Sequence, residues 1–198
     1  MSIVTRATDA GRPSRHHVPG HFDPGNEHHE TLADGAAVLI RSLRADDRQL
    51  ETDFIRDLSP HSRRLRFLCD FKQPSDALID QMMDVDHDLR EALIAVVLVE
   101  GTPRAVAVAR YCAAMEADTC ECAVTVADAW QHHGLGTLLM RHLIDEARSH
   151  GFRRMISIDA AGNHAMRGLA LSLGFQRRLD PDDPSQVIHS IDLQARPS

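Results

Sequence analysis

Apolar residues recur along this chain with two spacings, and each spacing predicts one type of element. Continuous apolar runs such as Ala92–Val99 are typical of buried strands. Apolar residues that return every three or four positions, as Leu135, Leu139 and Leu143 do, are typical of a helix with one buried face. Strands are predicted on this basis at residues 36–41, 92–99, 105–111, 121–126, 155–158, 176–179 and 186–193.

Capping residues and helix breakers agree with these spacings. Asp46 or Asp47 can cap a helix that Pro60 stops, and Gly151 suits the left-handed position after a helix end. Helices are predicted from Asp46 or Asp47 to Pro60 and at residues 62–71, 75–83, 134–150 and 163–173.

The order of these elements predicts an α+β (mixed α/β) fold on one sheet without an internal repeat. The segment Glu100–Arg104 contains Gly and Pro and joins two apolar runs, as expected for a hairpin. The folded domain is predicted to span residues 34–194. A flexible His-, Gly- and Pro-rich tail is predicted at residues 1–33, and a short tail at 195–198.

Composition excludes several classes of protein. The 198 residues carry a formal net charge of −7, so a nucleic-acid partner, which needs clustered cations, is not expected. Neither a signal peptide nor an apolar run long enough to cross a membrane is present. The four cysteines lack a secretory context and are interpreted as reduced apolar residues, which favours a cytoplasmic location. No metal site is expected, because Cys120 and Cys122 lack partners for a tetrahedral set.

The segment Gln131–Thr137 places Gly134 and Gly136 where a strand gives way to the strongest predicted helix. A helix N-terminus carries unpaired N–H groups, and glycines leave the approach open for an anion such as a pyrophosphate. A turn that needs glycine only for its conformation is the structural alternative. A dinucleotide-binding loop, with Asp159 on a ribose, fits less well because Leu139 occupies the third glycine position.

Gln131-x-x-Gly134-x-Gly136 resembles the acyl-CoA pyrophosphate loop of the GNAT superfamily of N-acyltransferases. Ile40–Asp47 is similar to the first strand and turn of that superfamily, and Asn163–Met166 with Gly174–Phe175 is similar to its late helix. The resemblance implies the GNAT fold. In this fold a central, mostly antiparallel sheet splays after the fourth strand and carries helices on both faces.

Two further segments, Leu58–Phe67 and Val85–Leu93, are similar to the bacterial protein-lysine acetyltransferase (Pat-type) branch. The resemblance implies acetyl-CoA as co-substrate, with backbone groups of the Val124–Val126 strand binding its pantetheine arm and the glycine loop binding its pyrophosphate. The cofactor-binding residues that it implies are Val124, Val126, Gln131, His132, His133, Gly134, Leu135, Gly136, Thr137 and Asn163.

The resemblance also implies a glutamate general base, and Glu91 is the matching residue. Asp86 and Asp88 lie in the same acidic segment, so the base could be shifted by a few positions, and without the resemblance Glu91 would be interpreted as a surface residue. The backbone N–H of Val126 or a neighbour is expected to polarise the thioester carbonyl. Ala170 stands where many relatives have a tyrosine acid, so no general acid is assigned.

The sequence therefore predicts an acetyl-CoA-dependent N-acetyltransferase that acts on protein lysine side chains. Transfer to a small-molecule amine and a non-catalytic acyl-CoA sensor are the alternatives. The sequence does not determine the oligomeric state, so a homodimer stays open.

Overall fold

The fold is built around one sheet of eight strands. The computed structural model describes residues 27–67 and 71–194. Its strand order is β1-β2-β3-β4-β5-β6-β8-β7, and every neighbouring pair except β5–β6 is antiparallel. The strands are β1 (His28–Thr31), β2 (Ala37–Ser42), β3 (Arg90–Val99), β4 (Thr102–Ala113), β5 (Thr119–Val126), β6 (Arg154–Ala160), β7 (Gln176–Leu179) and β8 (Gln186–Asp192).

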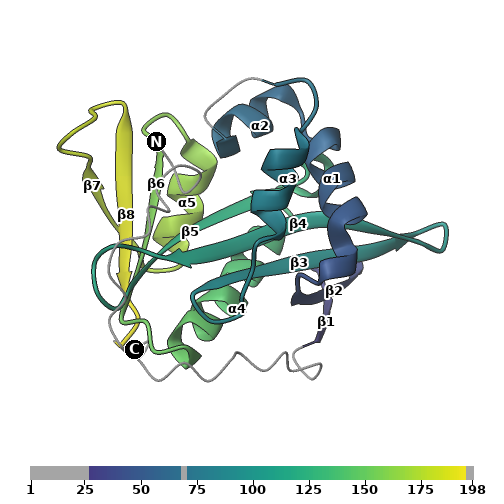
Figure 1. Ribbon diagram of the computed structural model, residues 1–198, viewed down its shortest axis with the longest axis horizontal. Coiled ribbons are helices and arrows are strands. Elements are labelled where there is room, and N and C mark those ends of the chain that lie inside the picture. Colours follow the sequence, from purple (N-terminus) through teal and green to yellow (C-terminus); the bar gives the residue numbers. More distant parts are fainter. Residues whose placement is uncertain (1–26, 68–70, 195–198) are drawn as a thin grey trace.

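Helices cover both faces of the sheet (Figure 1). α1, α2 and α3 lie on one face, here called the α1 face, and α4 and α5 pack on the other, the α4 face. The helices are α1 (Arg48–Asp57), α2 (Pro60–Phe67), α3 (Asp76–Met83), α4 (Leu135–Ser149) and α5 (His164–Ser172), with short 3-10 turns η1 (Ala45–Asp47) and η2 (Asp128–Trp130). Within the described residues, no helix is long and apolar enough to cross a membrane.

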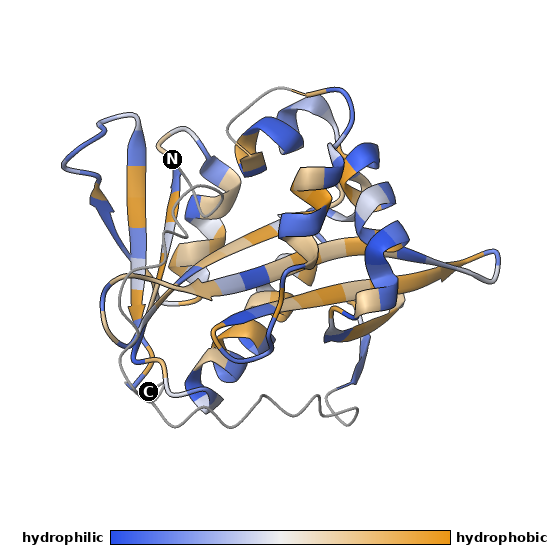
Figure 2. Ribbon diagram, viewed as in Figure 1, coloured by the Kyte–Doolittle hydropathy of each residue, from blue (hydrophilic) through white to orange (hydrophobic). Residues whose placement is uncertain are grey.

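The central strands contribute side chains to two separate hydrophobic cores, one on each face of the sheet. Along β3, Leu93 and Ala95 pack into the core under α4, whereas Ala92 and Ile94 pack into the core under α1. Successive strand side chains point to opposite faces, so a strand covered on both sides must be apolar throughout. This explains the continuous apolar run of β3, which is orange along much of its length in Figure 2.

The sheet separates between β5 and β6. These parallel strands pair only at Thr119–Glu121 with Arg154–Ile156. Beyond that point β6, β8 and β7 turn away from β3, β4 and β5 (Figure 1). Since β1 was not predicted, β5 is the fourth of the predicted strands, and the predicted mixed fold with a splay after it is confirmed.

The predicted flexible tail at residues 1–33 is wrong at its C-terminal end. Residues 28–31 form β1, which pairs with β2, and Leu32 is buried. The segment His-His-Glu-Thr has no apolar alternation; backbone pairing with β2 and contacts of His28 and Glu30 with His142 of α4 hold it in place. Residues 1–26 and 195–198 lie outside the described residues. Pro60, predicted to stop a helix, also begins α2, because proline fits the first turn of a helix.

Candidate active site

A cavity of about 550 Å³ opens where β5 and β6 separate. This volume lies within the usual range for small-molecule sites. Five parts of the chain line it: α2, β5 with the loop after it, the first turn of α4, the end of β6, and α5 with the residue before it. The lining residues from α2 and β5 are His61, Ser62, Leu65, Arg66 and residues 122–126, and those from β6 and α5 include Ile158, Asp159, Asn163, Met166 and Leu169.

The two glycines of the loop have different structural roles. Gly134 is the N-cap of α4 and has φ +82°, a left-handed conformation that costs other residues strain. Gly136 lies inside the first turn, where an added Cβ would be 3.4 Å from Val126 Cγ2 and 3.7 Å from Leu169 Cδ2. Gly134 is therefore needed for conformation, and Gly136 keeps the space between β5 and α5 free.

The N-terminus of α4 faces this cavity through Gly134, Gly136 and Thr137. The first hydrogen bond of the helix runs from Leu138 N–H to the Gly134 carbonyl at 3.0 Å. The N–H groups before Leu138 are those that a helix leaves unpaired, and the helix dipole adds partial positive charge there. This end of the cavity is suited to a phosphate or pyrophosphate group.

Gln131 fixes the loop rather than reaching into the cavity with a free amide. Its Nε2 donates to the Val126 carbonyl at 3.1 Å and to Ser62 Oγ at 3.3 Å. Asp128 holds the start of α2 next to this loop. It accepts hydrogen bonds from Ser59 N–H at 2.9 Å, Ser59 Oγ at 2.7 Å and Ser62 Oγ at 2.8 Å. Burial raises the pKa of Asp128, but these hydrogen bonds outweigh it, so the net pKa is lowered.

Asn163 caps α5 and keeps its amide nitrogen available. Its Oδ1 accepts from Met166 N–H at 3.0 Å, so Nδ2 remains to donate to a ligand carbonyl in the cavity. The cap and the ligand contact thus use different atoms of the same side chain.

Arg66 brings a positive charge to the cavity wall. Its guanidinium lies over the Phe67 ring at 5.0 Å, and its Nη1 is buried without a hydrogen-bond partner among the described residues. Burial, and then the charge of Arg110, lowers the pKa of Arg66 to about 10, so the side chain is still protonated at neutral pH. The charges of Glu51 and then of Glu121 partly offset this lowering of the pKa.

Eight of the ten predicted cofactor-binding residues line the cavity, and two do not. His133 is turned away and pairs with Asp34, with Nδ1 2.6 Å from Oδ2. Leu135 is 1% exposed and belongs to the core under α4. The lining residues are Val124, Val126, Gln131, His132, Gly134, Gly136, Thr137 and Asn163.

Glu91, the predicted general base, does not line the cavity. It lies in β3, is 2% exposed, and its Oε2 is 3.1 Å from His87 Nδ1. In the sheet it is directly opposite Tyr111, which is opposite Cys122 on β5. Two strand spacings, roughly 10 Å, and the buried Tyr111 therefore separate Glu91 from the cavity. Without a catalytic role, Glu91 was expected at the surface. That expectation is wrong, because Glu91 is buried.

The chain's single tyrosine is also outside the cavity. Tyr111 is 2% exposed, donates to the Asp88 carbonyl at 3.2 Å and contacts His150 Nδ1 at 2.7 Å. Burial, followed by the charge of Glu91, raises the pKa of Tyr111 well above its usual range. Ala170 is 1% exposed and packs in the core. Neither residue is positioned to protonate a ligand in the cavity.

The sequence alone did not indicate that α2 forms one wall of the cavity or that Asp159 lines the cavity beside α5. The similarity of Leu58–Phe67 to the Pat-type branch was a signal for α2, since four of its residues line the cavity. Asp159 was noticed only as a possible ribose ligand. In the part of the chain that the structure describes, no three His, Cys, Asp or Glu side chains are grouped to hold a metal ion.

A sheet that opens beside the N-terminus of a helix, with a cavity between them, suits an extended ligand with an anionic end, such as an acyl-CoA thioester. The sequence profile of the acetyltransferase (GNAT) family matches residues 55–175. Acetyltransferase PA5475 of Pseudomonas aeruginosa is 52% identical over 164 residues, which are 83% of this chain and 88% of that protein. The chain belongs to the acetyltransferase (GNAT) family.

Solved structures agree with this family. The GNAT domain of S. lividans PAT has a TM-score of 0.78 at 24% identity and covers 87% of this chain and 99% of its own. The protein yncA from Salmonella typhimurium, solved with its cofactor acetyl-CoA, has a TM-score of 0.63 at 21% identity, covering 81% and 96%. Acetyl-CoA is accordingly the co-substrate that the fold and the family support, and the non-catalytic sensor is set aside.

Proposed function

We propose that this chain transfers the acetyl group of acetyl-CoA to the side-chain amine of protein lysines. The observation that carries the proposal is the cavity wall formed by α2. The segment Leu58–Phe67, which resembles the Pat-type branch, forms this helix and contributes His61, Ser62, Leu65 and Arg66 to the cavity. The name PAT of the S. lividans neighbour agrees with that branch.

Within this proposal the cofactor lies along β5. Its pyrophosphate would bind the N-terminus of α4, and its pantetheine arm would extend along the β5 edge toward Cys122, with Asn163 Nδ2 donating to an amide carbonyl. The amine attacks the thioester carbonyl, a C–N bond forms, the C–S bond breaks and the thiolate takes up a proton. Backbone N–H groups of β5 would polarise the carbonyl oxygen.

We propose Glu121 rather than Glu91 as the glutamate base. Glu121 is partly exposed, occupies the last paired position of β5 before the sheet separates, and precedes the cavity-lining Cys122. Its side chain is on the α1 face, the side on which α2 and Arg66 lie, whereas Glu91 is on the α4 face behind Tyr111. A base must reach the amine directly or through one water.

A matched pair of variants tests this assignment. We expect Glu121→Gln to lower kcat/KM at neutral pH by roughly 10²- to 10⁴-fold, the usual contribution of a general base. The kcat/KM of this variant should recover as pH rises. Glu91→Gln should keep kcat/KM within about threefold while changing stability. Loss of turnover in Glu91→Gln alone, with a folded protein and normal CoA binding, would return the base to Glu91.

One observation favours transfer to a small amine that carries a carboxylate. Arg66 brings a charged guanidinium to the cavity wall, and its buried Nη1 has no hydrogen-bond partner among the described residues. Such a group pairs well with the carboxylate of an amino acid. Arg66→Lys should then raise the KM of the small acceptor strongly, whereas a lysine in a protein has no carboxylate at that distance.

Labelled acetyl-CoA and a whole-cell lysate from the host separate these functions. The products are divided by size, and the labelled proteins are digested to find the modified residue. Label on lysines that is lost with Glu121→Gln supports the proposal. Label in the small-molecule fraction supports the alternative, and absence of label above the no-enzyme control in both fractions refutes both.

We include a cytoplasmic location in this proposal. The three described cysteines, Cys112, Cys120 and Cys122, are free thiols. Free thiols persist in a reducing compartment. Fractionation of host cells with an antibody against the chain would test it.

A further inference from the structure

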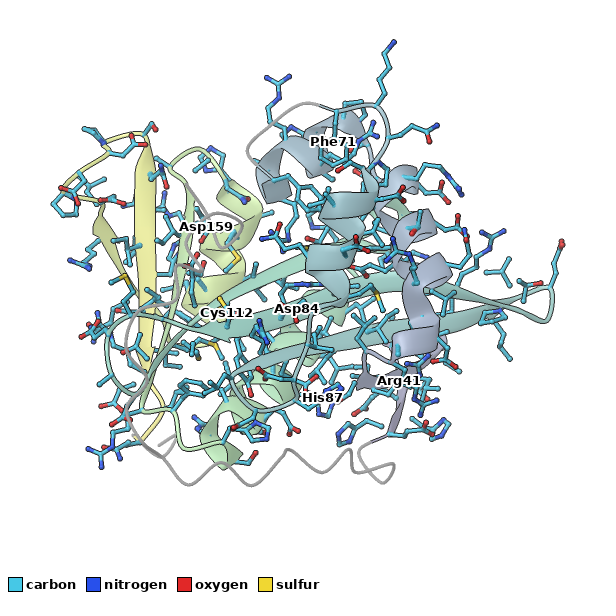
Figure 3. All side chains as sticks on the ribbon, viewed as in Figure 1. Arg41, Phe71, Asp84, His87, Cys112 and Asp159 are labelled. Atoms are coloured by element: carbon cyan, nitrogen blue, oxygen red, sulfur yellow. The ribbon has the colours of Figure 1, made fainter. Side chains whose placement is uncertain are left out.

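Asp159 is an acidic residue on the cavity wall that the proposed reaction does not use. It lies near the end of β6, opposite the β5 edge, and its side chain is 17% exposed. Figure 3 shows it beside α5, in a different region from His87. Its neighbours on the cavity wall include Ile158, Met166 and Leu169, so a charge here requires an explanation.

One oxygen of Asp159 is held by two buried donors. Oδ2 accepts from Ser157 Oγ, and His189 Nδ1 lies 3.0 Å from the same oxygen. Ser157 and His189 are each 1% exposed. His189 Nε2 is buried without a partner among the described residues. Since Nδ1 is the ring nitrogen near Oδ2, the tautomer with its hydrogen on Nδ1 donates to Asp159.

The other oxygen, Oδ1, has no hydrogen bond to any described residue and is not a buried atom. Because Ser157 and His189 both hold Oδ2, the carboxylate keeps one orientation, and Oδ1 is a fixed acceptor at the cavity surface. The ligand chemistry that it suits is a neutral or charged N–H donor.

We propose that Asp159, held in place by Ser157 and His189, positions the cofactor by accepting a hydrogen bond from an amide N–H of its pantetheine arm. The inference rests on the proposed function, in which the arm passes between β5 and β6. Asn163 Nδ2 and Asp159 Oδ1 would then be complementary, one donating to an amide carbonyl and the other accepting from an amide N–H.

The test compares two ligands that differ by the pantetheine arm. Dissociation constants of CoA and of adenosine 3′,5′-bisphosphate, which lacks the arm, are measured for the wild type and Asp159→Asn. The asparagine can keep the contacts to Ser157 and His189 through its oxygen and turns an N–H group toward the cavity. We expect CoA to bind roughly tenfold to a hundredfold more weakly, as for loss of a hydrogen bond to a charged group, and the bisphosphate to change less than about twofold.

Controls separate this role from a structural one. Asp182→Asn makes the same chemical change at an exposed residue that does not line the cavity, and it should leave both constants unchanged. Equal weakening of both ligands by Asp159→Asn would mean a general structural effect and overturn the inference. A raised KM for the amine with an unchanged CoA constant would assign Asp159 to the acceptor and also overturn it. Failure of the wild type to bind CoA more tightly than the bisphosphate would refute the proposed function itself.

Discussion

Alanine should destabilise the protein at Gly134 and not at Gly136. Gly134 has φ +82° and open space around its Cβ position, so Gly134→Ala adds backbone strain alone. That strain costs roughly 1–2 kcal/mol, which for a chain of this size lowers Tm by about 2–8 °C. Gly136 is helical, and alanine there gains about 0.5–1 kcal/mol of helix propensity.

The contact with Val126 determines how much of this gain in helix propensity Gly136→Ala retains. The new methyl would lie 3.4 Å from Val126 Cγ2, a close contact that needs only a small adjustment, so we expect Tm to rise by about 1–4 °C or stay level. Gly168→Ala, in α5 with nothing within 4 Å, measures the propensity gain without a contact. Differential scanning calorimetry of the three variants provides the values. A loss of Tm in Gly136→Ala as large as that in Gly134→Ala would refute the reasoning.

Three further predictions follow from hydrogen bonds and charge. Asp128→Ala removes the three bonds that hold α2 and, because the carboxylate is exposed, should cost only about 1–2 kcal/mol by chemical denaturation; an unchanged midpoint would show that water replaces them. The hydrogen bond that His87 donates to Glu91, partly offset by burial, raises the pKa of His87, so this pair stabilises the fold below about pH 6.5 and the effect is lost as pH rises through the raised pKa. His87→Asn should therefore cost more stability at pH 6 than at pH 8 in urea titrations, and an equal cost would refute the pairing. Arg110→Met should destabilise by roughly 3–5 kcal/mol, since it leaves the buried Glu51 carboxylate unpaired; Glu51→Gln in the same background should recover part of the loss.

The sequence predicts most of the fold because the hydrophobic pattern of most segments matches which of their residues are buried. The runs around β3 and β4 are apolar since both faces are covered, and the spacing along α4 matches its single buried face. β1 has no such pattern, because its four residues are held by backbone pairing with β2 and by polar contacts with His142 rather than by apolar burial. Side-chain spacing carries no information about an edge strand of that kind.

The sequence predicts the parts of the candidate site that depend on local backbone conformation. It does not predict the parts that depend on which residues lie opposite one another in neighbouring strands. The glycine loop and Asn163 belong to helix starts that sequence motifs describe well. The location of Glu91 depends instead on the register of three strands, which puts Tyr111 between it and Cys122. A motif gives the residue type and not its neighbours across the sheet.

The break in pairing between β5 and β6 opens the cavity. Buried peptide groups must find hydrogen-bond partners, yet β5 pairs with β6 only as far as Glu121. Gln131 satisfies the Val126 carbonyl, and an extended ligand with its own amides can satisfy the groups between. With the α4 N-terminus at the Val126 end, the anionic part of that ligand must lie there. Its reactive end is then expected near Cys122 and Glu121, where the strands meet and an amine approaching from α2 would encounter it.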